Sequence, residues 1–294
     1  MQSSPASIFG WEKGNLHPKM VEMPDSPAVT SRDGTTIGYT TTGTGPGVII
    51  VPGNNRMAHN YARFAACLSG EFTVHTIERR GRGRSGPQGD NYSILTEVED
   101  VRSVMAATGA TNMLGHSYGG FIALQAARAE PLIRKLIAYE PSVSLNGSFD
   151  LSWLPEFEAA FHSGKNLKAT VIFLRKAKLS VVSTWPTPVL YALAGLLLSG
   201  PSGREMLSLM PTTSAEIREV QRADTDGAEY RAISASTLLL GGEKGAAALL
   251  QILPELQKII PRARVTLLPG LNHNGPDLGP VEAIATAVAA HLQP

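Results

Sequence analysis

The sequence has little of several features on which whole classes of protein depend. A single cysteine, Cys67, occurs in 294 residues, so no disulfide can form within the chain. No group of cysteine and histidine residues has the spacing of a zinc site, and we expect neither a metal nor a cofactor. Cys67 lies in the apolar helical pattern of residues 62–68, where we expect a small buried side chain rather than a nucleophile.

Net charge and long hydrophobic runs are also scarce. The net charge is +1, which gives no electrostatic reason to expect nucleic acid or an anionic membrane as a partner. The arginine-rich run of residues 79–84 is short and broken by glycines, so we expect a turn whose arginines are solvated or paired with carboxylates. The longest apolar stretch, residues 189–198, is shorter than the about 20 residues that span a bilayer. Residues 1–25 lack the basic start and apolar core of a secretory signal. We therefore expect a cytoplasmic protein without membrane insertion, and one that could form homodimers.

What the chain has instead is an alternation of strand and helix patterns with short turns. Strands are expected at residues 28–31, 35–41, 48–51, 72–77, 111–114, 136–139, 236–241 and 264–268, and helices at 58–68, 92–107, 121–128 and 281–292. Asp33-Gly34 predicts a hairpin turn between the first two strands. This alternation predicts an α/β fold with a doubly wound, mostly parallel sheet and helices on both faces.

The alternation stops after Pro141 and resumes at Ser236. Between them, residues 145–235 have helical patterns, prolines and bulky apolar side chains. They predict a helical cap, or lid, over the carboxyl edge of the sheet, where open α/β folds bind ligands. We expect three parts in all, which are an N-terminal extension of residues 1–25, a core of residues 26–144 and 236–294, and the cap.

The most informative stretch is Gly115-His116-Ser117-Tyr118-Gly119, which has the pattern G-x-S-x-G between an expected strand and an expected helix. A serine hydroxyl is a weak nucleophile until a sharp turn presents it to a base. The glycines on either side allow such a turn, because a bulkier side chain would collide with the neighbouring strand and helix. The pattern predicts that Ser117 is a nucleophile.

A serine nucleophile needs a base and a third group that orients the base. His273 is the expected base, since it lies on the Gly-, Asn- and Pro-rich loop of residues 269–276 before the last helix. Such a loop can hold an imidazole over the sheet edge, whereas a helix face would bury it.

Two carboxylates could orient this base. Glu140 directly follows the strand after the one that leads to Ser117, and Glu243 follows a later strand. We favour Glu140 because strands consecutive in sequence usually pair. Glu243 is followed by Lys244 among glycines, which is typical of a solvated loop.

The expected oxyanion hole combines two backbone N–H groups. Tyr118 follows the nucleophile, and Asn54 lies on the turn after residues 48–51. Because a backbone group is the donor, we expect little effect from substituting Asn54 unless its side chain also contacts substrate. Further substrate contacts are expected from Asn55, His59, Trp153, Phe157 and Trp185.

These motifs resemble those of the α/β-hydrolase superfamily over most of residues 28–144 and 236–292. The resemblance is carried by Val51-Pro52-Gly53-Asn54, Glu78-Arg79-Arg80-Gly81-Arg82-Gly83-Arg84-Ser85, Gly115-His116-Ser117-Tyr118-Gly119, Tyr139-Glu140-Pro141 and Gly270-Leu271-Asn272-His273. It implies an eight-stranded sheet and the order serine, acid, histidine. The chain departs from the usual pattern twice, because the His-Gly of the oxyanion loop is Pro52-Gly53 here and Gly245 stands where members often have an aspartate. The second departure favours Glu140, since some members, such as the zearalenone-hydrolase type, carry their acid after the earlier strand.

Together these features predict a cofactor-free serine hydrolase that cleaves a carboxylic ester or lactone of a hydrophobic small molecule through an acyl-enzyme. A serine at this turn argues against an epoxide hydrolase or haloalkane dehalogenase, which need a carboxylate there. Two alternatives remain open. One is a ligand-binding sensor that retains the three residues, and the other is a non-hydrolytic enzyme of the same fold, such as a C–C hydrolase, lyase or cofactor-free oxygenase.

Overall fold

The centre of the protein is one mixed β-sheet. The computed structural model describes residues 27–179 and 181–293, so the expected extension of residues 1–25 lies outside the described residues. Within them, eight strands pair in the order β1-β2-β4-β3-β5-β6-β7-β8. The strands are β1 (Ala28–Thr30), β2 (Thr36–Thr42), β3 (Gly47–Val51), β4 (Thr73–Ile77), β5 (Asn112–His116), β6 (Lys135–Tyr139), β7 (Ser236–Gly242) and β8 (Ala263–Leu268). Only the pairs that include β2 are antiparallel, which confirms a mostly parallel sheet.

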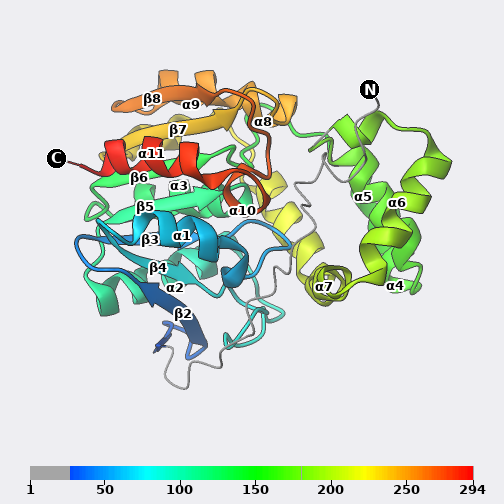
Figure 1. The fold of residues 1–294 in the computed structure, drawn as a ribbon, viewed down its shortest axis with the longest axis horizontal. Helices are drawn as coiled ribbons and strands as arrows, with labels where there is room; N and C mark the ends of the chain where they lie inside the picture. The colour runs from blue at the N-terminus through cyan, green and yellow to red at the C-terminus, as the bar shows by residue number, and fades with distance from the viewer. Residues whose placement is uncertain (1–26, 180, 294) are drawn as a thin grey trace.

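Helices cover both faces of this sheet, which confirms the doubly wound arrangement (Figure 1). The side chains of β3 alternate between the faces, with Ile49 and Val51 on one and Val48 and Ile50 on the other, and all four are buried. The first face packs against α2 (Ile94–Thr108), α3 (Tyr118–Ala129) and α9 (Ile252–Ile259), and the second against α1 (Ala62–Leu68) and α11 (Val281–Leu292). Three short helices complete the core, namely η2 (Ala58–Tyr61), α8 (Ala247–Leu250) and α10 (Gly275–Leu278).

The expectation of a buried Cys67 was wrong, because this cysteine is exposed. The buried residues of α1 are Phe64, Ala65 and Leu68, which form one face of the helix. At about 100° per residue, Cys67 points to the side of that face and away from the sheet. An apolar run on a short helix shows which residues could be buried, but it does not show which of them face the sheet.

The segment between β6 and β7 is helical, as expected for residues 145–235, which we call the helical insertion. It contains α4 (Leu154–His162), α5 (Asn166–Lys176), η3 (Val181–Thr184), α6 (Thr187–Ser199), α7 (Pro201–Arg222) and η4 (Ala228–Ala232). Figure 1 shows α4, α5 and α6 grouped beside the sheet, with α7 between this group and the core. The insertion has apolar clusters of its own, in which α4, α5 and α7 pack together. None of the helices in the described part of the chain is long and apolar enough to cross a membrane.

Candidate active site

Ser117 lies at a sharp turn between β5 and α3. Its backbone has φ 54° and ψ −119°, a strained conformation that residues with a side chain seldom adopt and that is found mainly at functional sites. A Cβ atom on Gly115 would lie 2.1 Å from the carbonyl oxygen of Gly119, and one on Gly119 would lie 2.0 Å from that of Val51. The two glycines are therefore required because the helix and the neighbouring strand leave no room for a side chain.

The structure brings Ser117, His273 and Glu140 together. His273 Nε2 lies 3.1 Å from Ser117 Oγ, and His273 Nδ1 lies 2.9 Å from Glu140 Oε2. Both the imidazole and the carboxylate are buried. Glu140 follows β6, which pairs with β5 as the order of the strands predicts. The contacts run from a hydroxyl through an imidazole to a carboxylate, which is the geometry that proton transfer away from a serine requires.

Glu140 is held as a carboxylate. Its Oε1 accepts a hydrogen bond from the N–H of Gly242 at 3.0 Å, and its Oε2 accepts one from the N–H of Ala246 at 3.3 Å. Burial by itself would raise the pKa of Glu140, but the hydrogen bond and charge of His273 and the two N–H groups outweigh burial and lower the pKa. An ionised Glu140 can stabilise the imidazolium that forms when His273 takes a proton.

The alternative acid, Glu243, is not brought to His273. Its side chain is exposed, and its backbone N–H donates to the carbonyl of Leu268. Gly245, on the same loop, lies against Glu140, because a Cβ atom there would be 2.1 Å from Glu140 Oε1. The loop after β7 thus surrounds the carboxylate of Glu140 and supplies none of its own.

Two residues beside the nucleophile were missed by the sequence reasoning. Ser142 Oγ lies 3.3 Å from Ser117 Oγ, and the N–H of Ser142 donates to the carbonyl of Ser117. The signal for it was its place two residues after Glu140, at the same sheet edge. The second is His116, inside the G-x-S-x-G pattern itself.

His116 links two loops of the site through a neutral imidazole. Its Nε2 lies 2.8 Å from the carbonyl oxygen of His273, so Nε2 carries the proton and donates it. Its Nδ1 then accepts from the hydroxyl of Tyr61 at 2.7 Å, and Tyr61 in turn accepts from the N–H of Gly53 at 3.0 Å. Burial lowers the pKa of His116 to about 4, so the ring stays neutral near pH 7.

Residues 52–55, which we call the oxyanion loop, lie against the nucleophile. A Cβ atom on Gly53 would be 3.2 Å from Ser117 Cβ. Asn54 follows this glycine, and Tyr118 is the first residue of α3, where backbone N–H groups have no partner within the helix. The two N–H groups expected to bind an oxyanion therefore belong to segments on either side of Ser117.

The expected substrate contacts have other partners in the structure. Asn55 Oδ1 accepts from Thr213 Oγ1 at 2.8 Å. The side chain of His59 is 64% exposed and pairs with Glu205 of α7 at 2.9 Å, and this hydrogen bond raises the pKa of His59. Three aromatic residues pack inside the helical insertion, namely Trp153, Phe157 and Trp185. Their contact with a substrate stays a prediction.

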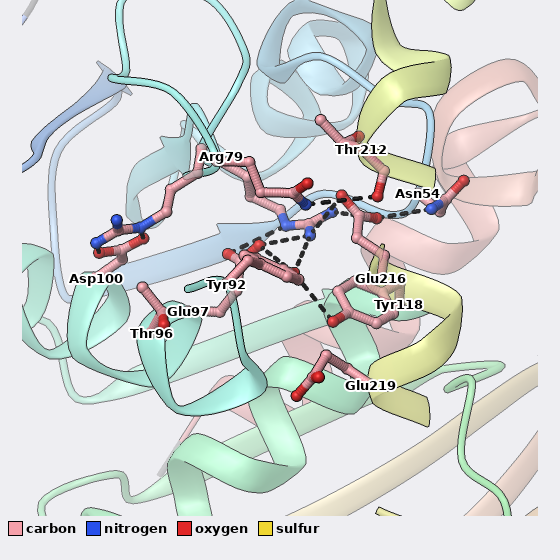
Figure 2. A network of polar contacts seen from close by, with 12 residues as sticks. Asn54, Arg79, Tyr92, Thr96, Glu97, Asp100, Tyr118, Thr212, Glu216 and Glu219 are labelled. Carbon is pink, nitrogen blue, oxygen red and sulfur yellow. Dashed lines mark hydrogen bonds and ion pairs between the residues drawn. The ribbon is translucent and has the colours of Figure 1, made fainter. Parts of the chain in front are cut away.

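Three arginines of the arginine-rich run are buried and paired with carboxylates, namely Arg79, Arg80 and Arg82. For these three the paired alternative is correct and the solvated one is wrong. Figure 2 shows the network around Arg79. The ion pairs are Arg79 with Glu97, Arg80 with Asp100 and Arg82 with Glu216, each with a nitrogen-to-oxygen distance of 2.6 Å. Within residues 27–179 and 181–293, no group of three or more His, Cys, Asp or Glu residues is arranged to hold a metal ion.

Comparison with known proteins agrees with the fold. The sequence model of a protein family described as the alpha/beta hydrolase family matches residues 48–287. The chain belongs to the alpha/beta hydrolase family. An alpha/beta hydrolase from Sphaerobacter thermophilus is similar in structure, with a TM-score of 0.77 and 27% identity over 91% of this chain and 100% of that one. An esterase from Rhodococcus has the same fold, with a TM-score of 0.67 and 20% identity over 90% of this chain and 97% of that one.

One curated relative is similar over a shorter stretch. A fluoroacetate dehalogenase from Burkholderia is 33% identical over 92 residues, which are 29% of this chain and 30% of that protein. The chain thus aligns with less than a third of the length of this relative. The family membership establishes a hydrolase-type enzyme of this fold and leaves the bond that it cleaves to be argued from the site.

Proposed function

We propose that this protein is a serine hydrolase that cleaves a carboxylic ester or lactone of a hydrophobic small molecule. The observation that carries the proposal is the buried series of contacts from Ser117 Oγ to His273 at 3.1 Å and from His273 to Glu140 at 2.9 Å. The proposal rests on these contacts and not on the fold, because one fold can support many different functions.

The proposed reaction has two halves. Ser117 Oγ attacks the carbonyl carbon while His273 Nε2 takes the hydroxyl proton, and the N–H groups of Asn54 and Tyr118 bind the oxyanion. Collapse of the tetrahedral intermediate breaks the ester C–O bond, and His273 gives its proton to the leaving alkoxide. Water then attacks the acyl-enzyme with His273 as base, which releases the acid and restores Ser117.

The serine favours this chemistry over halide displacement, although one relative is named a dehalogenase. Displacement of a halide by a serine hydroxyl would leave an ether, which water cannot readily cleave. A carboxylate nucleophile would leave an ester, which water can cleave, but Ser117 occupies the nucleophile position here. We therefore propose acyl transfer to serine.

The proposed preference for hydrophobic substrates comes from the helical insertion. Its helices are rich in apolar side chains, several of which are exposed, among them Val189, Tyr191 and Leu196 of α6. We propose that the insertion acts as a lid whose apolar side chains contact the substrate.

The test is covalent labelling followed by turnover. A fluorophosphonate probe should label the wild-type protein, and Ser117→Ala should abolish both labelling and the burst of p-nitrophenol from p-nitrophenyl esters. Ser142→Ala is the matched control, because the Ser142 hydroxyl lies only 3.3 Å from the Ser117 hydroxyl. This variant should keep the label, since His273 bonds to Ser117 and not to Ser142.

The outcomes separate the alternatives. Absence of label at Ser117 in folded protein would refute the hydrolase proposal, and labelling without turnover of any ester would favour the ligand-binding sensor. A panel of acyl-chain lengths and lactones, each compared with Ser117→Ala, then identifies the substrate class.

A further inference from the structure

The backbone of the oxyanion loop is bound by a buried guanidinium. Arg79 Nη1 donates to the carbonyl oxygens of Gly53 at 3.2 Å and Pro52 at 3.5 Å. The carbonyl of Gly53 and the N–H of Asn54 belong to one planar peptide and point in opposite directions. A hydrogen bond that fixes this carbonyl therefore also fixes the direction of the N–H. The positive guanidinium next to the carbonyl oxygen polarises the peptide and strengthens its N–H as a donor.

Arg79 also contacts the residue that carries the second oxyanion donor. Its Cζ lies 4.8 Å from the centre of the Tyr118 ring. The Tyr118 hydroxyl is 3.0 Å from that of Tyr92, which donates to Glu97. One guanidinium thus contacts both segments of the proposed oxyanion hole. Figure 2 shows Arg79 together with Tyr118, Glu97 and Glu216.

The guanidinium is held from two sides, one of them outside the core. Glu97 of α2 lies 2.6 Å from Arg79 Nη2, and Glu216 of α7 lies 3.0 Å from the same nitrogen. Glu216 also pairs with Arg82, and the side chains of Arg79, Arg82 and Glu216 are fully buried. Burial would raise the pKa of Glu216, but the charges of Arg79 and Arg82 outweigh burial and lower the pKa, so the carboxylate remains ionised.

Helix α7 reaches the oxyanion loop directly as well. Asn54 Nδ2 donates to Glu216 Oε2 at 2.7 Å, and Thr213 Oγ1 donates to Asn55 Oδ1 at 2.8 Å. Residues 213 and 216 lie on one face of the helix. Asn55 has φ 53°, a conformation that a non-glycine residue keeps only when its surroundings hold it.

We propose that Arg79 and Glu216 are positioning residues for the oxyanion hole, so that α7 of the helical insertion completes a site whose reacting groups all lie in the core. The inference rests on the proposed function. It assigns α7 a role in stabilising the transition state, distinct from any contact between the insertion and the substrate.

The test is Glu216→Gln, assayed on the best ester of the panel. Loss of one oxyanion donor costs about 10²- to 10³-fold in kcat, so a misdirected donor should cost about tenfold or more. KM should change by less than about threefold, since the ground-state carbonyl depends little on this donor. A boronic acid that mimics the tetrahedral intermediate should lose affinity by the same factor as kcat/KM.

Glu219→Gln is the matched control. Glu219 is a buried carboxylate on the same helix and accepts from the N–H of Ile94, at the start of α2, without touching the oxyanion loop. The kcat of this variant should stay within about twofold of the wild type, because the substitution weakens only the hydrogen bond from Ile94 and the ion pair with Arg222, neither of which touches the oxyanion loop. Equal losses in both variants would overturn the inference, because docking of α7 in general would then explain them.

Two further variants decide the matter if Glu216→Gln does not fold. Asn54→Ala and Thr213→Val each remove one contact between α7 and the loop and leave the buried charges balanced. Because the Asn54 side chain binds Glu216, the inference replaces the sequence-based expectation that substituting Asn54 has little effect. A lower kcat and weaker boronic acid binding, with KM retained, support the inference, whereas unchanged kcat in both overturns it. Failure of wild-type Ser117 to react with the fluorophosphonate would instead refute the proposed function itself.

Discussion

His116→Gln should change how stability depends on pH. In the folded protein the His116 imidazole donates to the carbonyl of His273 and accepts from the hydroxyl of Tyr61. A glutamine amide can still donate to that carbonyl but has no proton to gain near neutral pH. The substitution therefore removes one titrating group from the interior and keeps a polar side chain in its place.

The magnitude follows from the shift of the His116 pKa from 6.5 to about 4 on folding. The unfolded chain binds a proton at His116 below pH 6.5, while the folded chain resists it, so the wild type loses stability as pH falls from 6.5 towards 4. At about 1.4 kcal/mol per pH unit, the loss is about 2 kcal/mol at pH 5 and about 3 kcal/mol at pH 4, below which it levels off. Above pH 7 this group contributes no pH dependence.

Urea unfolding from pH 7.5 to pH 4.5 measures the effect. The difference in the free energy of unfolding between wild type and His116→Gln should shrink by about 2 kcal/mol on going from pH 7.5 to pH 5, because only the wild type carries the titrating ring. His59→Gln is a control of opposite sign. The pKa of His59 is raised by Glu205, so this pair stabilises the wild type more as pH falls. Parallel pH profiles for wild type and His116→Gln would refute a neutral buried His116.

Three further predictions concern single positions. Glu140→Gln should keep the fold and lower kcat by about 10³- to 10⁴-fold, because a neutral amide cannot stabilise the imidazolium; activity assays with a circular dichroism check measure this, and an active variant would exclude Glu140. Gly119→Ala should destabilise the protein by about 3 kcal/mol or more, since its Cβ would lie 2.0 Å from the carbonyl oxygen of Val51, and thermal unfolding measures this. Cys67 should react with a thiol reagent in the folded protein as fast as in urea, and protection by folding would contradict its exposed position.

Much of the site could be predicted because its residues directly follow strands. Ser117 and Glu140 come immediately after β5 and β6, and His273 lies on the loop after β8. Parallel strands bring their carboxyl ends to one edge of a sheet, so strand signals in the sequence already group these loops. The short-range pattern around the nucleophile then identifies which end carries the serine.

The contribution of α7 could not be predicted in this way. Glu216 meets Asn54 across 162 positions of sequence, and the contact depends on how the helical insertion docks on the core. Helical periodicity shows which residues share a face of α7 but not which loop that face meets. The aromatic residues of α4 show the same limit, because an apolar pattern is equally consistent with a substrate contact and with the interior packing that Trp153 and Phe157 have.

The position of the acid is the point at which packing decides between two readings of the sequence. β6 and β7 pair in parallel, with Tyr139 opposite Leu240, so the loops after both strands reach the same place beside His273. Only one of them can place a side chain there, because any Cβ on Gly245 would overlap the carboxylate of Glu140. The carboxylate of Glu140 therefore requires a glycine at position 245, and the glycine leaves the space that this carboxylate fills. With the acid at the end of β6, the loop after β7 must be small at residue 245. The last residue of β7, Gly242, and Ala246 after the loop contribute the N–H groups that keep the neighbouring carboxylate ionised.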